Sequence, residues 1–400
     1  MQQYLPEILL SPPRPDELEI SLFGPGRGEC VVAHLGNNKW LIVDSCLAKG
    51  NSEPVALQYF NRLNIDPYDA VKRIIISHWH DDHIKGISTI VKHCPAAYVY
   101  FPQALQQEEF FTLLTSFHSI DSRAGSVPVN LADFVRAEDL TSGLSEIARI
   151  VSHAYQQESV HRYKRKIKYA DDSTIIYEDR GNSPRVGVRS LSPSGKMVNN
   201  ALLYFAGLIP PSTQRGVIPY PEKNDASIAI WIEFNNIFVL LGGDLEDSTD
   251  HDLGWLAVLH GPNPPQGGKA SIFKVPHHGS ANGHNDQVWR HQLLPQVHAI
   301  LTPFYGSSNP PPTHSDLKRM IALTEHVSFT APPRIPKKKY DDHVVRKMLS
   351  GTVTERRTLV GQMGHIQIRT RDGERFTVGY DGPAALVTSD FLKEYEWLSR

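Results

Sequence analysis

The chain has few cysteines and almost no excess of charge of either sign. Its 400 residues include three cysteines, Cys30, Cys46 and Cys94, an odd number with no paired spacing. This excludes a disulfide framework and favours a reducing compartment, with the cysteines as small buried residues. The formal net charge of −2 excludes a strong overall attraction to nucleic acid or membrane, so any such binding must come from local patches.

Long apolar runs are also missing. No run approaches the length of about 20 residues that a membrane-spanning helix needs. The first residues contain no basic segment followed by an apolar one, so we expect no secretory signal. The hydrophobic content of 40% and charged content of 21% are typical of a globular protein, which we expect to be cytoplasmic.

The order of the expected elements is that of an α/β protein. Strand-like runs alternate with stretches of helical spacing, the clearest being 18–23, 71–76, 237–241 and 271–275 for strands and 54–63 and 84–93 for helices. We predict a single domain over residues 1–400. Two irregular segments interrupt the pattern, and we predict insertions there: 104–186, which forms a lid, and 332–358, which is basic.

The densest chemical pattern is Ser77-His78-Trp79-His80-Asp81-Asp82-His83, directly after a strand-like run. Imidazole and carboxylate groups are the ligands that zinc and its first-row neighbours favour. Because side chains alternate along a strand, His78 and His80 project to the same side. A turn then delivers Asp82 and His83 from the other direction. One short loop therefore supplies two pairs of ligands, enough to begin a site for two metal ions.

Two later strand ends carry matching groups. Asp244 follows an apolar strand and two glycines, and a carboxylate there can bridge two cations about 3.5–4 Å apart. His277 and His278 follow another strand. We expect His278 to be a ligand because it directly precedes a glycine turn, and His277 to face substrate, although the two roles can be reversed.

These motifs together resemble the metallo-β-lactamase superfamily, whose HxHxDH signature is similar to the histidine loop. Within it they resemble the metallo-β-lactamase domain of ComEC-type DNA-uptake proteins and their free-standing relatives. The matching segments appear in family order, at 24–29, 40–44, 78–83, 191–193, 224–227, 241–244, 275–280, 309–314 and 364–369. The resemblance covers most of residues 17–379 apart from the two insertions, and it implies a four-layer αββα sandwich.

The resemblance also implies a centre of two divalent ions, zinc or manganese. Its ligands would be His78 and His80 for the first ion, Asp82 and His83 for the second, Asp244 between them and His278 on the second. One departure concerns the first ion, to which many superfamily hydrolases supply a third histidine. The corresponding stretch here contains Ser192 and no histidine. A shell completed by water tolerates Mn²⁺ better than an all-histidine shell. We expect Asp44 to orient a ligand imidazole.

The implied reaction is hydrolysis by a hydroxide held between the two ions. Besides the ligand Asp82, the expected catalytic residues are the proton donors His277, Lys85 and His314, of which His314 also fits the start of a helix. The expected substrate-binding residues are Asn224, Ser227 and Ser280. Asn224 and Ser227 could also brace the loop, and a simple role in a β-turn is an equal alternative for both.

Three functions fit this sequence. The resemblance favours a phosphodiesterase or nuclease, acting on DNA, RNA or a nucleotide-type diester. Basic runs at 161–168 and 337–339, with Tyr163 and Tyr340, could contact phosphates and bases, and solvated loops fit them equally well. The alternatives are hydrolysis of a lactone, β-lactam or thioester, and a metal-stabilised protein that binds a partner without catalysis. We expect no membrane partner and leave a protein partner or homo-oligomer open.

Overall fold

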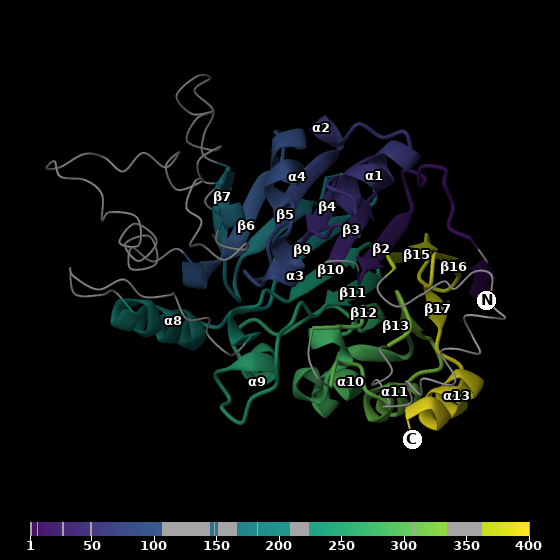
Figure 1. Cartoon of the computed structure of the whole chain (residues 1–400). Helices are drawn as coiled ribbons and strands as arrows, with labels where there is room; N and C mark the ends of the chain where they lie inside the picture. Colours follow the sequence, from purple (N-terminus) through teal and green to yellow (C-terminus); the bar gives the residue numbers. More distant parts are fainter. Residues whose placement is uncertain are drawn as a thin grey trace, which may run out of the picture.

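The computed structural model describes residues 2–5, 7–25, 28–48, 50–105, 145–147, 149–150, 166–181, 183–208, 224–306, 309–333 and 362–399. Two β-sheets lie face to face at the centre of this part of the chain, and helices cover the outer face of each sheet (Figure 1). The predicted α/β sandwich is confirmed. The strands are long apolar runs because most of them are covered on both faces.

The first sheet contains nine of the described strands. In spatial order they are β1 (Gln2–Leu5), β16 (Phe376–Asp381), β15 (Gly364–Thr370), β2 (Leu18–Gly24), β3 (Cys30–Leu35), β4 (Trp40–Val43), β5 (Val71–Ile75), β6 (Tyr98–Pro102) and β7 (Ile167–Ala170). Strands β4 to β7 run parallel, whereas β15, β2, β3 and β4 pair antiparallel in turn.

The second sheet contains eight described strands. In spatial order they are β17 (Ala385–Leu386), β14 (Val327–Phe329), β13 (Leu293–Leu301), β12 (Ala270–Lys274), β11 (Ile237–Leu241), β10 (Ile230–Phe234), β9 (Val186–Ser190) and β8 (Ile175–Asp179). Strands β11 to β14 are parallel. Ligands of α/β proteins bind beyond the carboxyl ends of parallel strands, which makes the ends of β5, β11 and β12 the expected place for a site.

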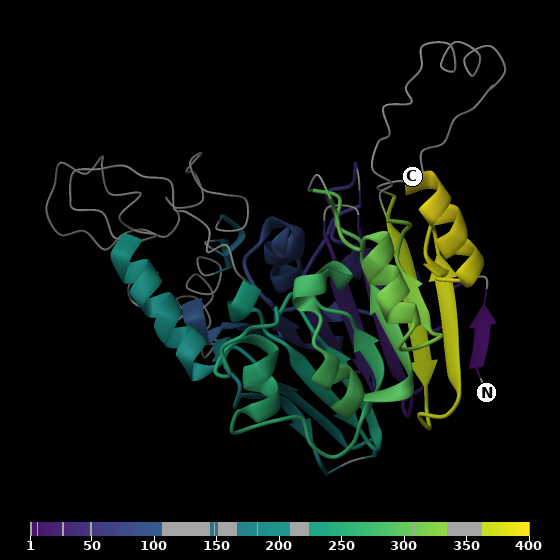
Figure 2. The same ribbon diagram turned by 90° about the horizontal axis from the view of Figure 1, so that it is seen from below.

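Helices form the two outer layers. One layer contains α1 (Val55–Arg62), α2 (Pro67–Ala70) and α4 (Ile87–His93), and the other contains α9 (Gly254–His260), α10 (Asp286–His291), α11 (His314–Ile321) and α13 (Ser389–Ser399). A further helix, α8 (Gly195–Leu208), projects from one end of the molecule, while β1 and α13 lie together at the opposite end (Figure 2).

Alternation along the strands builds three layers of core. Leu41 on β4 and Ile272 on β12 face the space between the sheets, whereas their neighbours Ile42 and Phe273 face the helices. Burial on both faces explains why β2, β3, β11 and β12 contain only buried residues. The three cysteines are buried and free, as expected.

Several boundaries differ from the sequence prediction. The expected helix over 84–93 is split into α3 (Asp81–Ile84) and α4, because Ser45 uses its N–H and its hydroxyl to bond the carbonyls of His83 and Lys85. The largely apolar run 226–234 also predicts a strand, but β10 begins only at Ile230, and residues Asn224–Ala226 form a 3₁₀ turn. Helices α8 and α13 were not predicted.

The predicted insertions fall largely outside the described residues. Strands β7 and β8, at the C-terminal end of the segment 104–186, pair with β6 and β9 at the sheet edges. Of the basic run 161–168, only residues 166–168 are described, and they belong mainly to β7. The run 337–339, Tyr163 and Tyr340 lie outside the described residues, as does most of the segment 332–358.

Among the described helices, none combines the length and the apolar character that crossing a membrane requires.

Candidate metal centre

The histidine loop leaves the sheet at the end of β5 and turns at once into the short helix α3. His78 lies in the extended part and His83 in α3, and both rings are buried. Asp82 precedes His83 on the same turn, and its side chain is 24% exposed. The loop therefore presents two imidazoles from the interior and one carboxylate at the surface.

Asp244 reaches the same place from the end of β11. Gly243 has a φ of +53°, and a Cβ there would lie 2.6 Å from Ser227 Oγ, so the turn requires glycine. The N–H of Asp244 donates to Ser227 Oγ at 3.0 Å. This bond fixes the backbone of Asp244 and points its buried carboxylate at the histidine loop.

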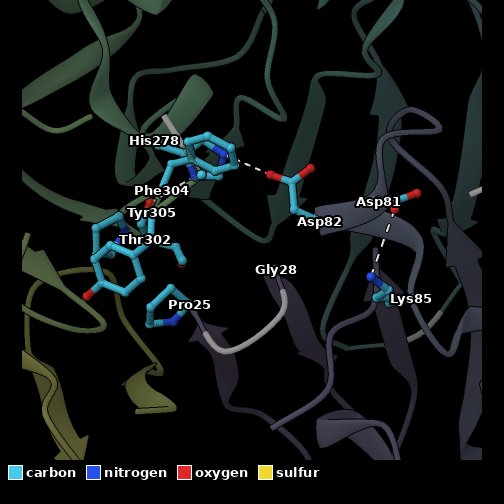
Figure 3. A pocket seen from close by; sticks show the side chains of 11 residues that line it. Pro25, Gly28, Asp81, Asp82, Lys85, His278, Thr302, Phe304 and Tyr305 are labelled. Atoms are coloured by element: carbon cyan, nitrogen blue, oxygen red, sulfur yellow. Dashed lines mark hydrogen bonds and ion pairs between the residues drawn. The ribbon is translucent and has the colours of Figure 1, made fainter. Parts of the chain in front are cut away.

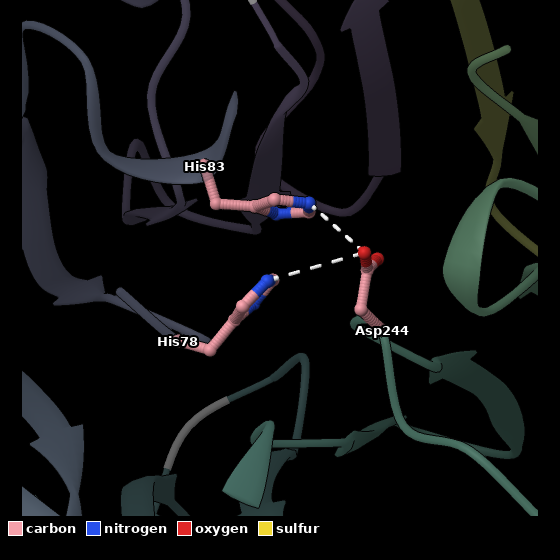
Figure 4. A group of neighbouring side chains, drawn as sticks. All are labelled: His78, His83 and Asp244. Atoms are coloured by element: carbon pink, nitrogen blue, oxygen red, sulfur yellow. Dashed lines mark ion pairs between the residues drawn. The ribbon is translucent and has the colours of Figure 1, made fainter. Parts of the chain in front are cut away.

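Three imidazole nitrogens surround one oxygen of Asp244. The Oδ2 atom lies 3.3 Å from Nε2 of His83, 3.5 Å from Nε2 of His278 and 4.0 Å from Nε2 of His78. Figure 4 shows His78 and His83 directed at Asp244 from the opposite side. Possible ligand atoms of His78, His83 and Asp244 all lie within 4.8 Å of one another.

A second group overlaps the first. Oδ2 of Asp82 lies 3.3 Å from Nε2 of His278 and 3.7 Å from Nε2 of His83 (Figure 3). Possible ligand atoms of Asp82, His83 and His278 also fall within 4.8 Å of one another. His83 and the Asp244 carboxylate thus stand between two groups of ligands, an arrangement that suits two neighbouring cations.

His80 is not part of either group. It precedes α3, and its ring makes an edge contact with His78 at a centroid distance of 4.6 Å. Burial lowers the pKa of His80 and leaves its ring neutral near pH 7. The structure therefore brings together five of the six predicted ligands and leaves His80 beside them.

The other nitrogen of each buried ring is held by a protein acceptor. Nδ1 of His83 lies 2.7 Å from Asp44, and Nδ1 of His278 lies 2.9 Å from the carbonyl of Thr302. Ser77 Oγ donates to Asp44 at 2.6 Å, so it accepts from Nδ1 of His78 at 3.0 Å. Because these acceptors require a proton on Nδ1, each neutral ring presents an Nε2 lone pair to Asp244. Asp44 thus makes the orienting contact that the sequence predicts.

The surroundings of these Nε2 atoms favour a bound cation. Nε2 of His78 and Nε2 of His83 are buried without a hydrogen-bond partner. A lone pair that faces a carboxylate across 3.3–4.0 Å is repelled unless a proton or a metal ion stands between them. The donor set, imidazole nitrogen with carboxylate oxygen, suits Zn²⁺ and Mn²⁺.

The charges of the site also favour a bound cation. Burial alone would lower the pKa of His83, but the carboxylates of Asp244, Asp82 and Asp44 raise it well above its ordinary value. Burial alone would raise the pKa of Asp244, but His83, His278 and Lys274 lower it well below its usual range. The carboxylates therefore stay ionised and attract positive charge to the space between them.

Two further charged residues, Glu29 and Lys274, were missed from the sequence. The Lys274 ammonium pairs with Glu29 Oε1, donates to the carbonyl of Gly243 at 2.7 Å and lies 3.5 Å from Asp244 Oδ1. Lys274 is 1% exposed, although it is the last residue of the apolar strand β12. The sequence did contain an indication of this pair, because a lysine at the end of a buried strand requires a buried partner of opposite charge.

The loop that holds Glu29 also contacts Asp82. Gly28 has a φ of +123°, and a Cβ there would lie 1.7 Å from the carbonyl oxygen of Asp82. The N–H of Glu29 donates to that same carbonyl at 2.9 Å. Gly28 is therefore required for the backbone contact that seats α3 and its two ligands.

The predicted proton donors lie in different places. His277 is partly exposed, with Nδ1 3.4 Å from Glu246 Oε1 and Nε2 3.3 Å from the Asn224 amide. Lys85 lines a cavity beside the ligands and lies 3.9 Å from Asp81. His314 begins α11, with its ring 6.1 Å from that of Tyr395, and is not among the described residues that line the cavity.

The predicted substrate-binding residues mostly brace the site. Ser227 is fully buried and holds Asp244, which is the bracing alternative and leaves its side chain no contact with substrate. Asn224 donates to Glu246 at 3.2 Å beside His277. Ser280 donates to Asn282 in the turn that follows His278. Ser192, in the stretch where the resemblance implies a third histidine, is buried, and its hydroxyl donates to Ser227 O and accepts from Ala229 N.

A cavity of about 350 Å³ opens onto the second group of ligands. Asp82 and His278 line it and face each other (Figure 3). The residues that line it are Pro25, Gly28, Asp81, Asp82, Lys85, His278, Thr302, Pro303, Phe304, Tyr305 and Gly306. Its size is within the range of sites that hold small molecules.

Comparison with known proteins agrees with this centre. Residues 23–146 match the family model described as the metallo-beta-lactamase superfamily, and the match includes the histidine loop. No curated protein matches the chain.

Solved structures with similarity include a metallo-beta-lactamase fold protein, YhfI from Bacillus subtilis, at 13% identity and a TM-score of 0.35, over 78% of this chain and 95% of that one. Human tRNase Z, short form, matches at 11% identity and a TM-score of 0.27, over 64% of this chain and 76% of that one. AidC, a dizinc quorum-quenching lactonase, matches at 16% identity and a TM-score of 0.27, over 54% and 55%. The family-model match therefore shows that residues 23–146, which include the histidine loop, are similar to the metallo-β-lactamase superfamily.

Proposed function

We propose that this protein is a metal-dependent phosphodiesterase, acting on DNA, RNA or a smaller nucleotide-type diester. The observation that carries the proposal is the set of imidazole Nε2 atoms around Asp244 Oδ2 at 3.3–4.0 Å, two of them buried without a hydrogen-bond partner. Such a set of nitrogen and oxygen atoms can bind cations, whereas a cluster with a purely structural role would have its buried nitrogens hydrogen-bonded.

Two divalent ions, zinc or manganese, would be held by the predicted ligands. His78 would serve one ion, with His80 beside it, and Asp82 and His278 would serve the other. Asp244 and His83 lie within reach of both groups, so the Asp244 carboxylate would be shared by the two ions. When bound, such ions supply an activated water nucleophile and offset the negative charge that develops on the attacked group.

Other residues of the chain would prepare the site for this chemistry. Asp44 and the Thr302 carbonyl hold the ligand rings in one orientation and one tautomer. His277, linked to Glu246 and Asn224, would donate a proton to the leaving oxygen. Lys85 would attract the substrate phosphate from the wall of the cavity.

Two features support a phosphodiester over a carbonyl substrate. The stretch in which the resemblance implies a third histidine contains Ser192 and no histidine, and the Ser192 hydroxyl is hydrogen-bonded within the protein core. The shell is consequently richer in oxygen, which suits manganese and phosphoryl chemistry. The motif resemblance to ComEC-type domains points in the same direction. Hydrolysis of a lactone, β-lactam or thioester, or a role in partner binding without catalysis, would be the outcome if diesters are not cleaved.

The test uses purified protein stripped of metal and reloaded separately with Mn²⁺ or Zn²⁺. It is incubated with labelled single- and double-stranded DNA, RNA, bis(p-nitrophenyl) phosphate and a homoserine lactone. We expect cleavage of at least one diester with one of the two metals, and loss of at least about 100-fold in kcat/KM for Asp82→Asn. The matched control is Asp69→Asn, an exposed carboxylate in the first turn of α2, with unchanged activity.

Three other results of this experiment would argue against the proposed function. Diester cleavage that Asp82→Asn leaves intact would exclude this site as its source. Turnover of the lactone alone would assign the carbonyl function. Metal binding without turnover of any substrate would support the partner-binding alternative.

A further inference from the structure

The cavity beside the ligands has two chemically different sides. Phe304 and Tyr305 lie on one side with Pro25 and His278, and Lys85 lies on the other side, with Asp82 between them (Figure 3). A phosphate placed at the ligands would therefore have a cation on one side of it and aromatic rings on the other.

The aromatic side is held rigidly. The Phe304 ring is stacked on the His278 ring, with centroids 5.2 Å apart and planes inclined by 27°. The N–H of Phe304 donates to the Pro311 carbonyl at 2.8 Å, and the Tyr305 hydroxyl donates to the Pro332 carbonyl at 2.7 Å. Both side chains remain partly exposed and line the cavity. Fixed, partly exposed rings lose little entropy when they bind a flat ligand.

From this arrangement we infer that Phe304 and Tyr305 form a stacking platform for a nucleobase, and that the substrate is a nucleoside phosphodiester rather than an alkyl one. The inference rests on the proposed function. Aromatic side chains can stack on any base, because every base has a π face. Lys85 would interact only with the charge of the phosphate. The cavity volume of about 350 Å³ suits a single nucleotide unit. The platform would therefore select for a nucleoside without selecting its sequence.

The test compares two diesters that share a leaving group, so that chemistry and recognition separate. These are thymidine 5′-(p-nitrophenyl phosphate) and methyl p-nitrophenyl phosphate. We expect kcat/KM for the nucleoside ester to exceed that for the methyl ester by about 10- to 100-fold, mainly through KM. In Phe304→Leu the ratio should fall to within about threefold of one, whereas Phe304→Tyr should retain most of it. Tyr305→Leu should reduce the ratio and Tyr305→Phe should preserve it.

Two controls exclude indirect effects. Tyr68→Leu removes an aromatic ring that is 55% exposed on α2 and should leave the ratio unchanged. Because Phe304 touches His278, the metal content of each variant is measured, and it should equal that of the wild type.

Failure of the inference and failure of the proposed function give different results. Cleavage of both esters with a ratio near one, or a ratio insensitive to Phe304→Leu, would overturn the platform and leave the phosphodiesterase intact. If neither ester is cleaved, the proposed function fails, and calorimetric titration of the metal-loaded protein still tests the platform. Thymidine 5′-monophosphate should bind at least about tenfold more tightly than methyl phosphate, and equal affinities would overturn it.

Discussion

Lys274 and Glu29 form an ion pair directly beside the metal ligands, with side chains that are only 2% and 3% exposed. The same ammonium lies 3.5 Å from Asp244, so one permanent cation serves two carboxylates. Burial alone would lower the pKa of Lys274, but Glu29 and Asp244 raise it, so the lysine stays charged. The ammonium therefore offsets part of the negative charge of Glu29 and Asp244 before any metal binds.

Removal of this ammonium should destabilise the fold. In Lys274→Met, Glu29 and Asp244 become buried carboxylates without that cation, and we expect a loss of about 3–5 kcal/mol in the free energy of unfolding of the metal-free protein. Glu29→Gln added to Lys274→Met should recover part of the loss, because it removes one of the unpaired charges. Urea unfolding of the two single variants and the double variant measures the coupling. Strictly additive losses would show that the pair is energetically unimportant.

The contact of Asp44 with His83 predicts an effect on metal affinity. Asp44→Asn keeps the size of the side chain but weakens the acceptor that holds Nδ1 of His83 at 2.7 Å. We expect the affinity for Zn²⁺ to fall by about 10- to 100-fold, as measured by competition with a chromogenic chelator. Asp390→Asn, whose side chain is 93% exposed, is the control. If Asp44→Asn and Asp390→Asn bind Zn²⁺ with equal affinity, the contact between Asp44 and His83 does not affect metal binding.

The sequence predicted that the candidate ligands lie close together, because each follows an apolar run. His78, Asp244 and His278 sit just beyond the ends of β5, β11 and β12, and the carboxyl ends of parallel strands meet at one rim. Asp44 could be predicted for the same reason, since it follows β4. The fold class followed from the order of the elements together with the resemblance.

What the sequence did not predict depends on contacts between distant segments. Glu29 and Lys274 form one buried pair, but each alone is an isolated charge next to an apolar strand. The break between α3 and α4 arises because Ser45 bonds carbonyls of the helical turn. Ser227 has the same motif position whether it binds substrate or braces Asp244, and only its burial distinguishes the two.

The contact between Gly28 and Asp82 predicts a difference between two glycine substitutions. Gly28 and Gly50 both have positive φ values, +123° and +79°, but a Cβ at Gly50 would meet no atom within 4 Å. Gly50→Ala should therefore show only backbone strain of about 1 kcal/mol. Gly28→Ala should show a larger loss of stability and at least about tenfold weaker metal binding, because the backbone of Asp82 must move. Thermal unfolding and metal titration compare the two, and a matching loss in both variants would contradict the proposed contact.

Buried histidines predict instability in mild acid. Burial lowers the pKa of His34 to about 4 and, together with nearby His326, that of His298 to about 3. In the unfolded chain both should titrate near 6.5. The unfolded state consequently binds more protons below pH 6.5, and stability falls as pH decreases towards the folded pKa values.

Replacement of His298 should remove part of this pH dependence. Between pH 6.5 and 5 each buried histidine costs about 2 kcal/mol, so the loss of stability over this interval should be smaller by that amount in His298→Leu. The exposed His93→Gln serves as control and should retain the wild-type loss. Comparison of differences between two pH values cancels the constant effect of each substitution. An unchanged loss in His298→Leu would exclude this histidine as a source.

Metal stoichiometry is the most direct test of whether two cations share the Asp244 carboxylate. After dialysis against excess Zn²⁺ or Mn²⁺ and removal of free metal, elemental analysis should give two ions per chain in the wild type. Asp82 belongs only to the group with His83 and His278, so Asp82→Asn should retain one ion. Asp244 faces His78, His83 and His278, so Asp244→Asn should lose both while circular dichroism shows a retained fold. One ion or none in the wild type, or equal stoichiometry in all three proteins, would exclude a shared carboxylate at Asp244.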